Sequence, residues 1–369
     1  MLKRYPHQVL MLLICLSLLP IFLPAQETKA DGGPSDVAAP EVSEPESAPG
    51  LQISGFIDAY YQNSFTKTVF PTSFTPNDKS FSLGMANLVL AKEGKVGFVA
   101  DIAFGPRAEA ANGYAGTALS FIKQMYVRYA ATESLTLTLG NFGTHVGYEV
   151  IDSKSNFNYS TSYMFSFGPF FHTGIKANLA LGEKFGAMLG VFNDTDTKID
   201  VVRGKHLGAQ FSYSDDRLST YLNYIGGRIS DLTDANGEIF AHQVDLTAVF
   251  QATEALGLGI NATVKNVTPT EGIAQSWSGM ALYAKYAFGK AFSLGARGEY
   301  ILDADGLILG LEEDHIAAFT LSGNIYLGNL TVIPEFRLDS ASKTGAYTNF
   351  EGNPLRSASG LMLAAVYSF

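Results

Sequence analysis

The chain has 369 residues and a formal net charge of -10 at pH 7, and only 16% of its residues are charged, against about 25% in a typical soluble domain. The acidic balance argues against a nucleic-acid-binding protein, which needs a basic face. The length exceeds one small domain, and few charges beside 47% hydrophobic residues are typical of a surface that partly faces lipid.

Residues 1–25 have the pattern of a signal peptide. The basic residues Lys3 and Arg4 precede an apolar stretch at 9–23, which is shorter than the roughly 20 residues of a membrane-spanning helix. Small residues at its end, including Ala25, offer a cleavage site. We therefore predict a cleaved signal peptide, with an uncleaved anchor helix as the alternative.

Residues 26–50 are rich in Pro, Glu, Ala and Ser. A segment of this composition cannot bury enough apolar surface to fold, so we predict a disordered acidic leader. The single cysteine, Cys15, lies within the predicted signal peptide. The processed protein is therefore expected to have no disulfide and no metal bound by cysteine.

From residue 51 onward, apolar and polar residues alternate with a period of two. In the stretch 256–265, apolar side chains occupy the even positions, and glycine or polar side chains the odd ones. Side chains alternate across a strand, so each such stretch has one apolar and one polar face. The predicted strands are 51–62, 80–92, 94–105, 119–131, 134–141, 170–182, 184–193, 205–214, 216–226, 241–252, 254–266, 277–288, 290–302, 314–327, 329–339 and 358–369.

The lengths of these strands and of their connections indicate a membrane barrel. Many strands have 10 to 13 residues, and a tilted strand needs about 9 to 11 to cross a bilayer. Seven short turns alternate with eight long polar loops, as in barrels with short periplasmic turns and long outer loops. The long loops are 63–79, 106–118, 142–169, 194–204, 227–240, 267–276, 303–313 and 340–357. We therefore predict an all-β fold over 51–369, a transmembrane antiparallel β-barrel of sixteen strands.

The last nine residues, 361–369, alternate apolar residues and end in Phe369. This ending resembles the assembly signal of outer-membrane barrels. The resemblance implies that the barrel assembly machinery is a partner through the C-terminal strand.

Three motifs flank and fill the longest loop: Gly147-Tyr148-Glu149, then Asn156-Phe157-Asn158-Tyr159-Ser160, then Gly168-Pro169-Phe170-Phe171-His172-Thr173-Gly174. Together they resemble the OmpL-like family of outer-membrane porins, and a looser similarity extends over 51–369. The resemblance implies a bacterial outer-membrane protein that admits small solutes passively, and it implies no catalytic residue.

The loop 142–169 follows the fifth strand. A barrel of 16 to 18 strands leaves an aqueous space that side chains of the wall alone do not fill. We therefore predict that this loop folds into the lumen, where Glu149, Asp152 and Lys154 line a constriction, and that neutralising the two acids Glu149 and Asp152 together would lower the preference of the pore for cations. A packed plug and an outward flap are the alternatives.

Alternation also assigns charged side chains to the lumen face, because a charge facing lipid at mid-depth costs about 2–4 kcal/mol. Seven bases and five acids are assigned in this way, and this mixture does not fix an ion preference. They are Asp58, Asp101, Arg128, Lys176, Arg217, Asp245, Lys265, Lys285, Arg297, Glu299, Glu335 and Arg337.

The function predicted from these features is passive diffusion through a water-filled channel, with no reaction catalysed. The expected partners are the lipid bilayer, small solutes and a second copy of the chain in a homo-oligomer. We predict no cofactor and no metal, because the six histidines lack metal-ligand spacing; a calcium site at 193–196 is a weaker interpretation. Two alternatives stay open: a structural or adhesive barrel with a blocked lumen, and a barrel hydrolase acting on lipid or glycan.

Overall fold

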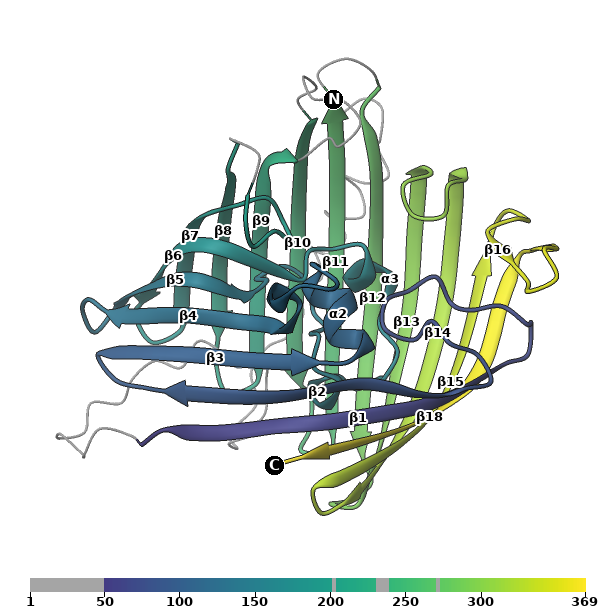
Figure 1. The fold of residues 1–369 in the computed structure, drawn as a ribbon, viewed down its shortest axis with the longest axis horizontal. Helices are drawn as coiled ribbons and strands as arrows, with labels where there is room; N and C mark the ends of the chain where they lie inside the picture. Colours follow the sequence, from purple (N-terminus) through teal and green to yellow (C-terminus); the bar gives the residue numbers. More distant parts are fainter. Residues whose placement is uncertain (1–49, 201–203, 230–238, 270–272) are drawn as a thin grey trace.

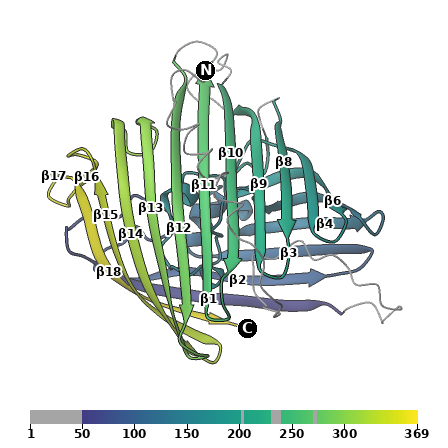
Figure 2. The same cartoon turned by 180° about the vertical axis from the view of Figure 1, so that it is seen from behind.

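The computed structural model describes residues 50–200, 204–229, 239–269 and 273–369, which form a closed antiparallel barrel. Figures 1 and 2 show it from two opposite sides, with β1–β5 in front in Figure 1 and β8–β15 in front in Figure 2. The barrel strands are β1 (Gln52–Ser64), β2 (Phe81–Lys92), β3 (Val96–Phe104), β4 (Ile122–Ala130), β5 (Leu135–Gly143), β6 (Phe171–Leu181), β7 (Phe185–Phe192), β8 (His206–Ser214), β9 (Leu218–Ile229), β10 (Ile239–Gln251), β11 (Leu256–Pro269), β12 (Gln275–Ala287), β13 (Phe292–Asp305), β14 (Glu312–Leu327), β15 (Leu330–Ala341) and β18 (Ser357–Ser368).

The predicted fold class and the predicted number of strands are confirmed. Sixteen strands pair in one ring, and each predicted strand overlaps one of them. The ring closes where β18 pairs with β1, with Phe56 opposite Ser368. Closure leaves no unpaired sheet edge, which a sheet in lipid requires.

The two faces of the wall differ as alternation predicts. In β12, Leu282 is 53% exposed on the outer face, while its neighbours Ala281 and Tyr283 are 0% and 3% exposed on the inner face. Large apolar side chains are exposed in the same way on most of the other strands. The outer face is therefore apolar, and the inner face carries the polar and charged side chains.

The wall is taller on one side than on the other. Strands β3–β8 have 8 to 11 residues, whereas β9–β15 have 12 to 16. Figure 2 shows β10–β12 rising above β3 and β4. The loops that follow the short strands therefore leave the wall at a lower level.

Several long connections contain regular structure where only loop was predicted. The segment 106–118 begins with the helix α2 (Pro106–Asn112), and the 3-10 helix η2 (Ala118–Phe121) delays the start of β4 to Ile122. Proline fits the first turn of a helix because no intrahelical partner is needed for its nitrogen, and alanines follow it. The other additions are η3 (Ser153–Ser155), α3 (Tyr163–Ser166) and the hairpin of β16 (Tyr347–Thr348) and β17 (Pro354–Leu355).

In the part of the chain that the structure describes, no helix is long and apolar enough to cross a membrane. The predicted signal peptide and nearly all of the predicted leader, residues 1–49, lie outside the described residues, as do parts of the loops 194–204, 227–240 and 267–276.

Candidate functional site

The connection between β5 and β6, residues 144–170, crosses the interior of the barrel; we call it the β5–β6 loop. Near its start, the Gly147 N–H donates to Asp245 Oδ1 of β10 at 2.9 Å. Further on, the Tyr163 N–H donates to Glu299 Oε2 of β13 at 2.8 Å. Strand β13 lies eight places from β5 in the ring of sixteen, so the loop reaches the opposite wall.

Arg297 of β13 connects the loop to that wall. Its Nη1 donates to Glu149 Oε1 at 2.6 Å and to the Ser160 carbonyl at 2.7 Å, and its Nη2 donates to Thr320 Oγ1 at 3.1 Å. Its Nε lies 2.8 Å from Glu299 Oε1. Glu149, Arg297 and Glu299 are each at most 5% exposed. Charges enclosed in this way must be paired, so these ion pairs fix the loop against the wall.

Arg337 of β15 makes a second connection. Its Nε and Nη2 donate to the two carboxylate oxygens of Asp339 at 2.9 and 3.0 Å, and its Nη1 donates to the Thr161 carbonyl at 2.9 Å. The Tyr163 hydroxyl donates to Asp339 at 2.8 Å. A bidentate arginine–carboxylate pair has a fixed geometry, so it also fixes the position of the loop.

Glu335 of β15 holds the loop through its backbone. Its carboxylate accepts from the Tyr159 N–H at 2.6 Å and from the Ser160 N–H at 3.1 Å. Backbone N–H groups outside regular structure need such acceptors when they are buried. The Glu335 carboxylate therefore replaces the strand pairing that this segment lacks.

Arg107 of α2 is a central residue that the sequence analysis missed. It is 0% exposed, and it donates to the carbonyl oxygens of Ile151 and Tyr159 at 3.1 and 3.3 Å. Its Nε lies 3.7 Å from Asp58 Oδ2. Helix α2 therefore supports the β5–β6 loop from the side of β1–β4. The only hint of this role in the sequence was a basic residue within 106–118, a segment predicted to be a loop without regular structure.

Lys123 of β4 was also missed, and it explains the position of Asp152. Its ammonium group pairs with Asp152 of the loop and lies 2.6 Å from Asp101 of β3. The pairing of β3 with β4 shifts register between Asp101 and Ile102. Simple alternation does not account for an irregularity of this kind.

The other predicted site residues occupy different places. Lys154 is exposed, with its ammonium group 5.6 Å from the centre of the Phe56 ring. Lys176 of β6 lies 4.5 Å from the centre of the Phe142 ring. Arg128 pairs with Glu93 of the β2–β3 turn at 2.7 Å, and Arg217 lies in the short turn between β8 and β9. The last two are therefore at the end of the barrel with short turns, away from the β5–β6 loop.

A cluster of rings surrounds the start of the β5–β6 loop. His145 Nε2 donates to the Tyr224 carbonyl oxygen of the wall at 2.9 Å, because a carbonyl oxygen can only accept. Its ring centroid is 5.2 Å from that of His172 and 5.9 Å from that of Phe192. Burial lowers the pKa of His145 to about 4, so the ring is neutral at pH 7.

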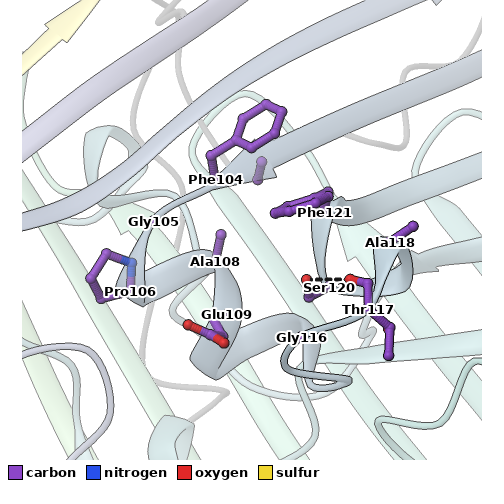
Figure 3. Close-up of a pocket in the computed structure, with 11 residues that line it drawn as sticks. Phe104, Gly105, Pro106, Ala108, Glu109, Gly116, Thr117, Ala118, Ser120 and Phe121 are labelled. Carbon is purple, nitrogen blue, oxygen red and sulfur yellow. Dashed lines mark hydrogen bonds between the residues drawn. The ribbon is translucent and has the colours of Figure 1, made fainter.

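Two cavities lie beside these elements. One, of about 500 Å³, lies between the end of β3, α2 and η2, where the rings of Phe104 and Phe121 stand 5.0 Å apart (Figure 3). The other, of about 240 Å³, is formed mainly by β8, β10, β11 and the start of the β7–β8 loop. Its lining residues are Pro169, Asp194, Thr195, His206, Ile225, Ala241, His242, Gln243, Lys265 and Val267.

Within the described ranges, no group of three or more His, Cys, Asp or Glu side chains is arranged to hold a metal ion. In the stretch 193–196, the Asp196 carboxylate accepts from the N–H groups of Phe170 and Phe171 at 2.7 and 2.9 Å. This carboxylate therefore positions the start of β6.

Comparisons with known proteins agree with this architecture. The family model described as beta-barrel porin-2, OmpL-like, matches residues 50–369. No curated protein matches the chain. Among solved structures, the chain is similar to the anion-selective porin from Comamonas acidovorans, with a TM-score of 0.61 and 10% identity, covering 87% of this chain and 99% of that one.

Two further structures are similar. The outer membrane channel DcaP of Acinetobacter baumannii has a TM-score of 0.59 and 13% identity, covering 86% of this chain and 97% of that one. A variant of the Rh. blastica porin has a TM-score of 0.53 and 18% identity, covering 87% and 100%. At such identities these likenesses show the fold. The family match covers most of the chain, and it is the finding that shows that this protein belongs to the OmpL-like family of β-barrel porins of the bacterial outer membrane.

Proposed function

We propose that solutes cross this porin passively, through the part of the lumen that the β5–β6 loop leaves open. The observation that carries the proposal is the path of the loop from β5 to the opposite wall at β13–β15. A loop bound across a barrel reduces its cross-section without interrupting the wall, since the wall closes through strand pairing. Cross-section and lining charge then limit which solutes pass.

In this proposal the buried residues set the width of the constriction indirectly. Glu149, Arg297, Glu299, Glu335 and Arg337 are at most 5% exposed, so they act by holding the loop at a fixed position. Ion pairs of this kind give a single arrangement, because every alternative leaves a buried charge unpaired. The pore is therefore expected to have one conductance state.

The predicted cation preference is not carried forward, because the two acids on which it rested are paired. Glu149 pairs with Arg297 at 2.6 Å, and Asp152 pairs with Lys123. Each of these cations is shared with a second carboxylate, Arg297 with Glu299 and Lys123 with Asp101, so the two acids belong to ion-pair clusters that hold the loop and are not free charges lining the solute path. Lys154 is exposed and Lys176 half-buried, so these two are the predicted residues best placed to meet a solute.

The test is conductance in planar bilayers with and without the loop. Replacing residues 148–167 by a short Gly-Ser linker should raise single-channel conductance and admit larger solutes. The matched control replaces residues 349–353, the largely exposed tip of the β16–β17 hairpin, by the same kind of linker. It keeps Tyr347, whose hydroxyl lies 3.0 Å from that of Tyr163 in the β5–β6 loop, and this variant should conduct as the intact protein does. Unchanged conductance after the first deletion would place the loop outside the solute path.

A blocked barrel is the second candidate, and one observation favours it. A buried apolar cluster joins the β5–β6 loop to the connection between β1 and β2, residues 65–80, and to β1, β2 and β18. It includes Phe74, Ile151, Tyr159 and Phe165. Buried side chains that pack together across the interior in this way can fill a lumen and leave no open path. An intact protein that carries no current, and whose long outer loops bind a partner, would make it a structural or adhesive barrel.

Processing and partners complete the proposal. We expect cleavage of residues 1–25, recognition of the C-terminal strand by the barrel assembly machinery, and association of barrels into a homo-oligomer. Detection of Met1 by N-terminal sequencing of membrane-extracted protein would refute the cleavage. A monomeric mass in mild detergent would refute the oligomer. We propose no catalysed reaction and no cofactor.

A further inference from the structure

The charged side chains of strands β5–β12 are mostly basic. Only five residues in these eight strands carry a full charge, and the four bases are Lys176, Arg228, Lys265 and Lys285. The one acid, Asp245, is 1% exposed, and its carboxylate accepts from the Gly147 N–H at 2.9 Å and from the Asn223 side chain at 3.0 Å. These eight strands therefore present no accessible acid to a solute.

Two of the four bases lie in the part of the lumen next to the short turns. Lys285 is two residues from the end of β12, and Lys176 lies at the middle of β6. Lys265 lies toward the long loops, where Asp194 and Asp196 are close enough to act on its charge. Those carboxylates oppose an anion near Lys265, so the short-turn side is the one on which an accessible positive charge is left.

Lys285 occupies an open position on the wall. In the register of the sheet it lies opposite Gly257 of β11 and Gly295 of β13, so no side chain flanks it on either neighbouring strand. Its Nζ lies 5.0 Å from the centre of the Phe157 ring in the β5–β6 loop, and the residue is half-buried. A ring face attracts a cation and leaves its charge in place. The ammonium group is therefore positioned and still within reach of a solute.

Lys154 adds a positive charge on the β5–β6 loop itself. It is exposed within η3, and its Nζ lies 5.6 Å from the centre of the Phe56 ring. Phe56 pairs with Ser368 at the end of β18, so this ammonium group also faces the short-turn side. Over residues 50–200, 204–229, 239–269 and 273–369, no carboxylate oxygen lies within ion-pair distance of Lys154 or Lys285.

The acids on the inner faces of β1, β3, β13 and β15 are enclosed. Asp58, Asp101, Glu299, Glu335 and Asp339 are each at most 5% exposed, and each contacts a cation or accepts from backbone N–H groups. Their carboxylates are therefore directed to protein partners and lie out of reach of a solute.

The charges at the rim of the short turns are balanced. Residues 92–95, 128–134, 182–184, 215–217, 252–255, 288–291 and 328–329 contain six acids and six bases. One of the ion pairs among them joins Arg128 to Glu93 at 2.7 Å. The rim therefore does not cancel the accessible positive charge of the lysines inside it.

We propose that the lumen on the short-turn side of the β5–β6 loop selects small anions, with Lys285 and Lys154 as the residues that determine the preference and Lys176 adding to it from β6. A fixed charge concentrates ions of opposite sign within about 8 Å of it at physiological ionic strength. The inference rests on the proposed channel function and gives it a substrate class, which is inorganic anions and small carboxylates or phosphates.

The experiment measures the reversal potential of the full-length protein in planar bilayers under a gradient of KCl. Potassium and chloride ions diffuse in water at nearly equal rates, so the sign of the potential reports the preference of the pore. A unit charge about 8 Å from an ion in water changes the local concentration of that ion about twofold. The permeability ratio of chloride to potassium should therefore exceed one, by about twofold. A ratio of one or below would overturn the proposal.

Single substitutions assign the preference to these lysines. Lys285→Met and Lys154→Met should each lower the permeability ratio, and the double variant should bring it close to one. The matched control is Lys290→Met, the same change at an exposed residue in the turn that follows β12, and this variant should keep the ratio of the intact protein. An equal shift in Lys290→Met would attribute the effect to overall charge and would refute the assignment.

Folding of each variant is checked by its gel shift on heating. If Lys285→Met does not fold, Lys154→Met at its exposed position decides against the same control. An unchanged ratio in that variant would contradict the assignment to Lys154.

The same recording separates the anion preference from the channel itself. A protein that carries no current would refute the proposed channel. A protein that conducts and prefers potassium would keep the channel and refute the anion preference.

Discussion

Replacing Arg297 by Met tests whether ion pairs hold the β5–β6 loop. The substitution removes a charge that two carboxylates share, with contacts of 2.6 Å to Glu149 and 2.8 Å to Glu299. Both acids keep one backbone donor each, from Ser162 and Tyr163. Removing one member of a buried ion pair costs about 3–5 kcal/mol, so the free energy of unfolding should fall by about that amount.

The assay is urea-induced unfolding in detergent, followed through the fluorescence of Trp277, which is the only tryptophan and is 2% exposed. Converting Glu149 and Glu299 to Gln in the Arg297→Met background should recover most of the loss, since no buried charge then remains unpaired. Lys67→Met is the matched control, because it breaks an exposed pair with Glu351 in which both side chains are 59% accessible. Equal effects of Arg297→Met and Lys67→Met would show that water already reaches the pairs, and the reasoning would fail.

Three further predictions concern other parts of the barrel. The pKa of His145 is about 4 in the folded protein and 6.5 in the unfolded chain, so its contribution to stability is complete above about pH 6.5 and is lost as the pH falls toward 4. In the His145→Gln variant, the melting temperature should therefore depend less on pH between 6.5 and 4 than in the intact protein. Leu282→Arg, near mid-depth on the lipid face of β12, should lower the free energy of unfolding of the barrel by about 2–4 kcal/mol, and Val96→Arg, near the membrane interface at the end of β3, should lower it by about 0–1 kcal/mol. Equal losses in a reversible folding assay would contradict these two depths. Deleting Phe369 should lower the yield of folded protein and leave single-channel conductance unchanged, and normal yield would mean that the terminal signal has been misidentified.

Strand positions were predictable because they depend on local alternation. The inner face of the wall meets water and the outer face meets lipid. A shift of the strand register by one residue would therefore turn polar side chains toward lipid. In β11, for example, the alternating stretch 256–265 lies within Leu256–Pro269. Boundaries were less certain where the end of a strand is set by packing, as at Ile122, which follows η2.

The partners of the charged residues were not predictable. Alternation assigned Arg297 and Glu335 to the inner face, but Glu149 and Arg297 are far apart in the chain, and their pairing depends on the path of an irregular loop. Arg107 is more instructive, because its role depends on a short helix in a segment interpreted as loop. Local sequence patterns report the face on which a side chain lies and carry no information about which distant group it meets.

The closing pair of strands has a consequence for how the protein folds. The first and last strands are neighbours, and nearly the whole chain lies between the paired residues Phe56 and Ser368. Joining distant segments costs conformational entropy that grows with the logarithm of their separation, and chains dominated by such long-range contacts fold slowly. Until β18 arrives, the sheet remains open with two unsatisfied edges, and such edges are templates for aggregation. The open sheet is therefore the species most prone to self-association during folding, and a change that slows the pairing of β18 with β1 should lengthen the time for which it is exposed.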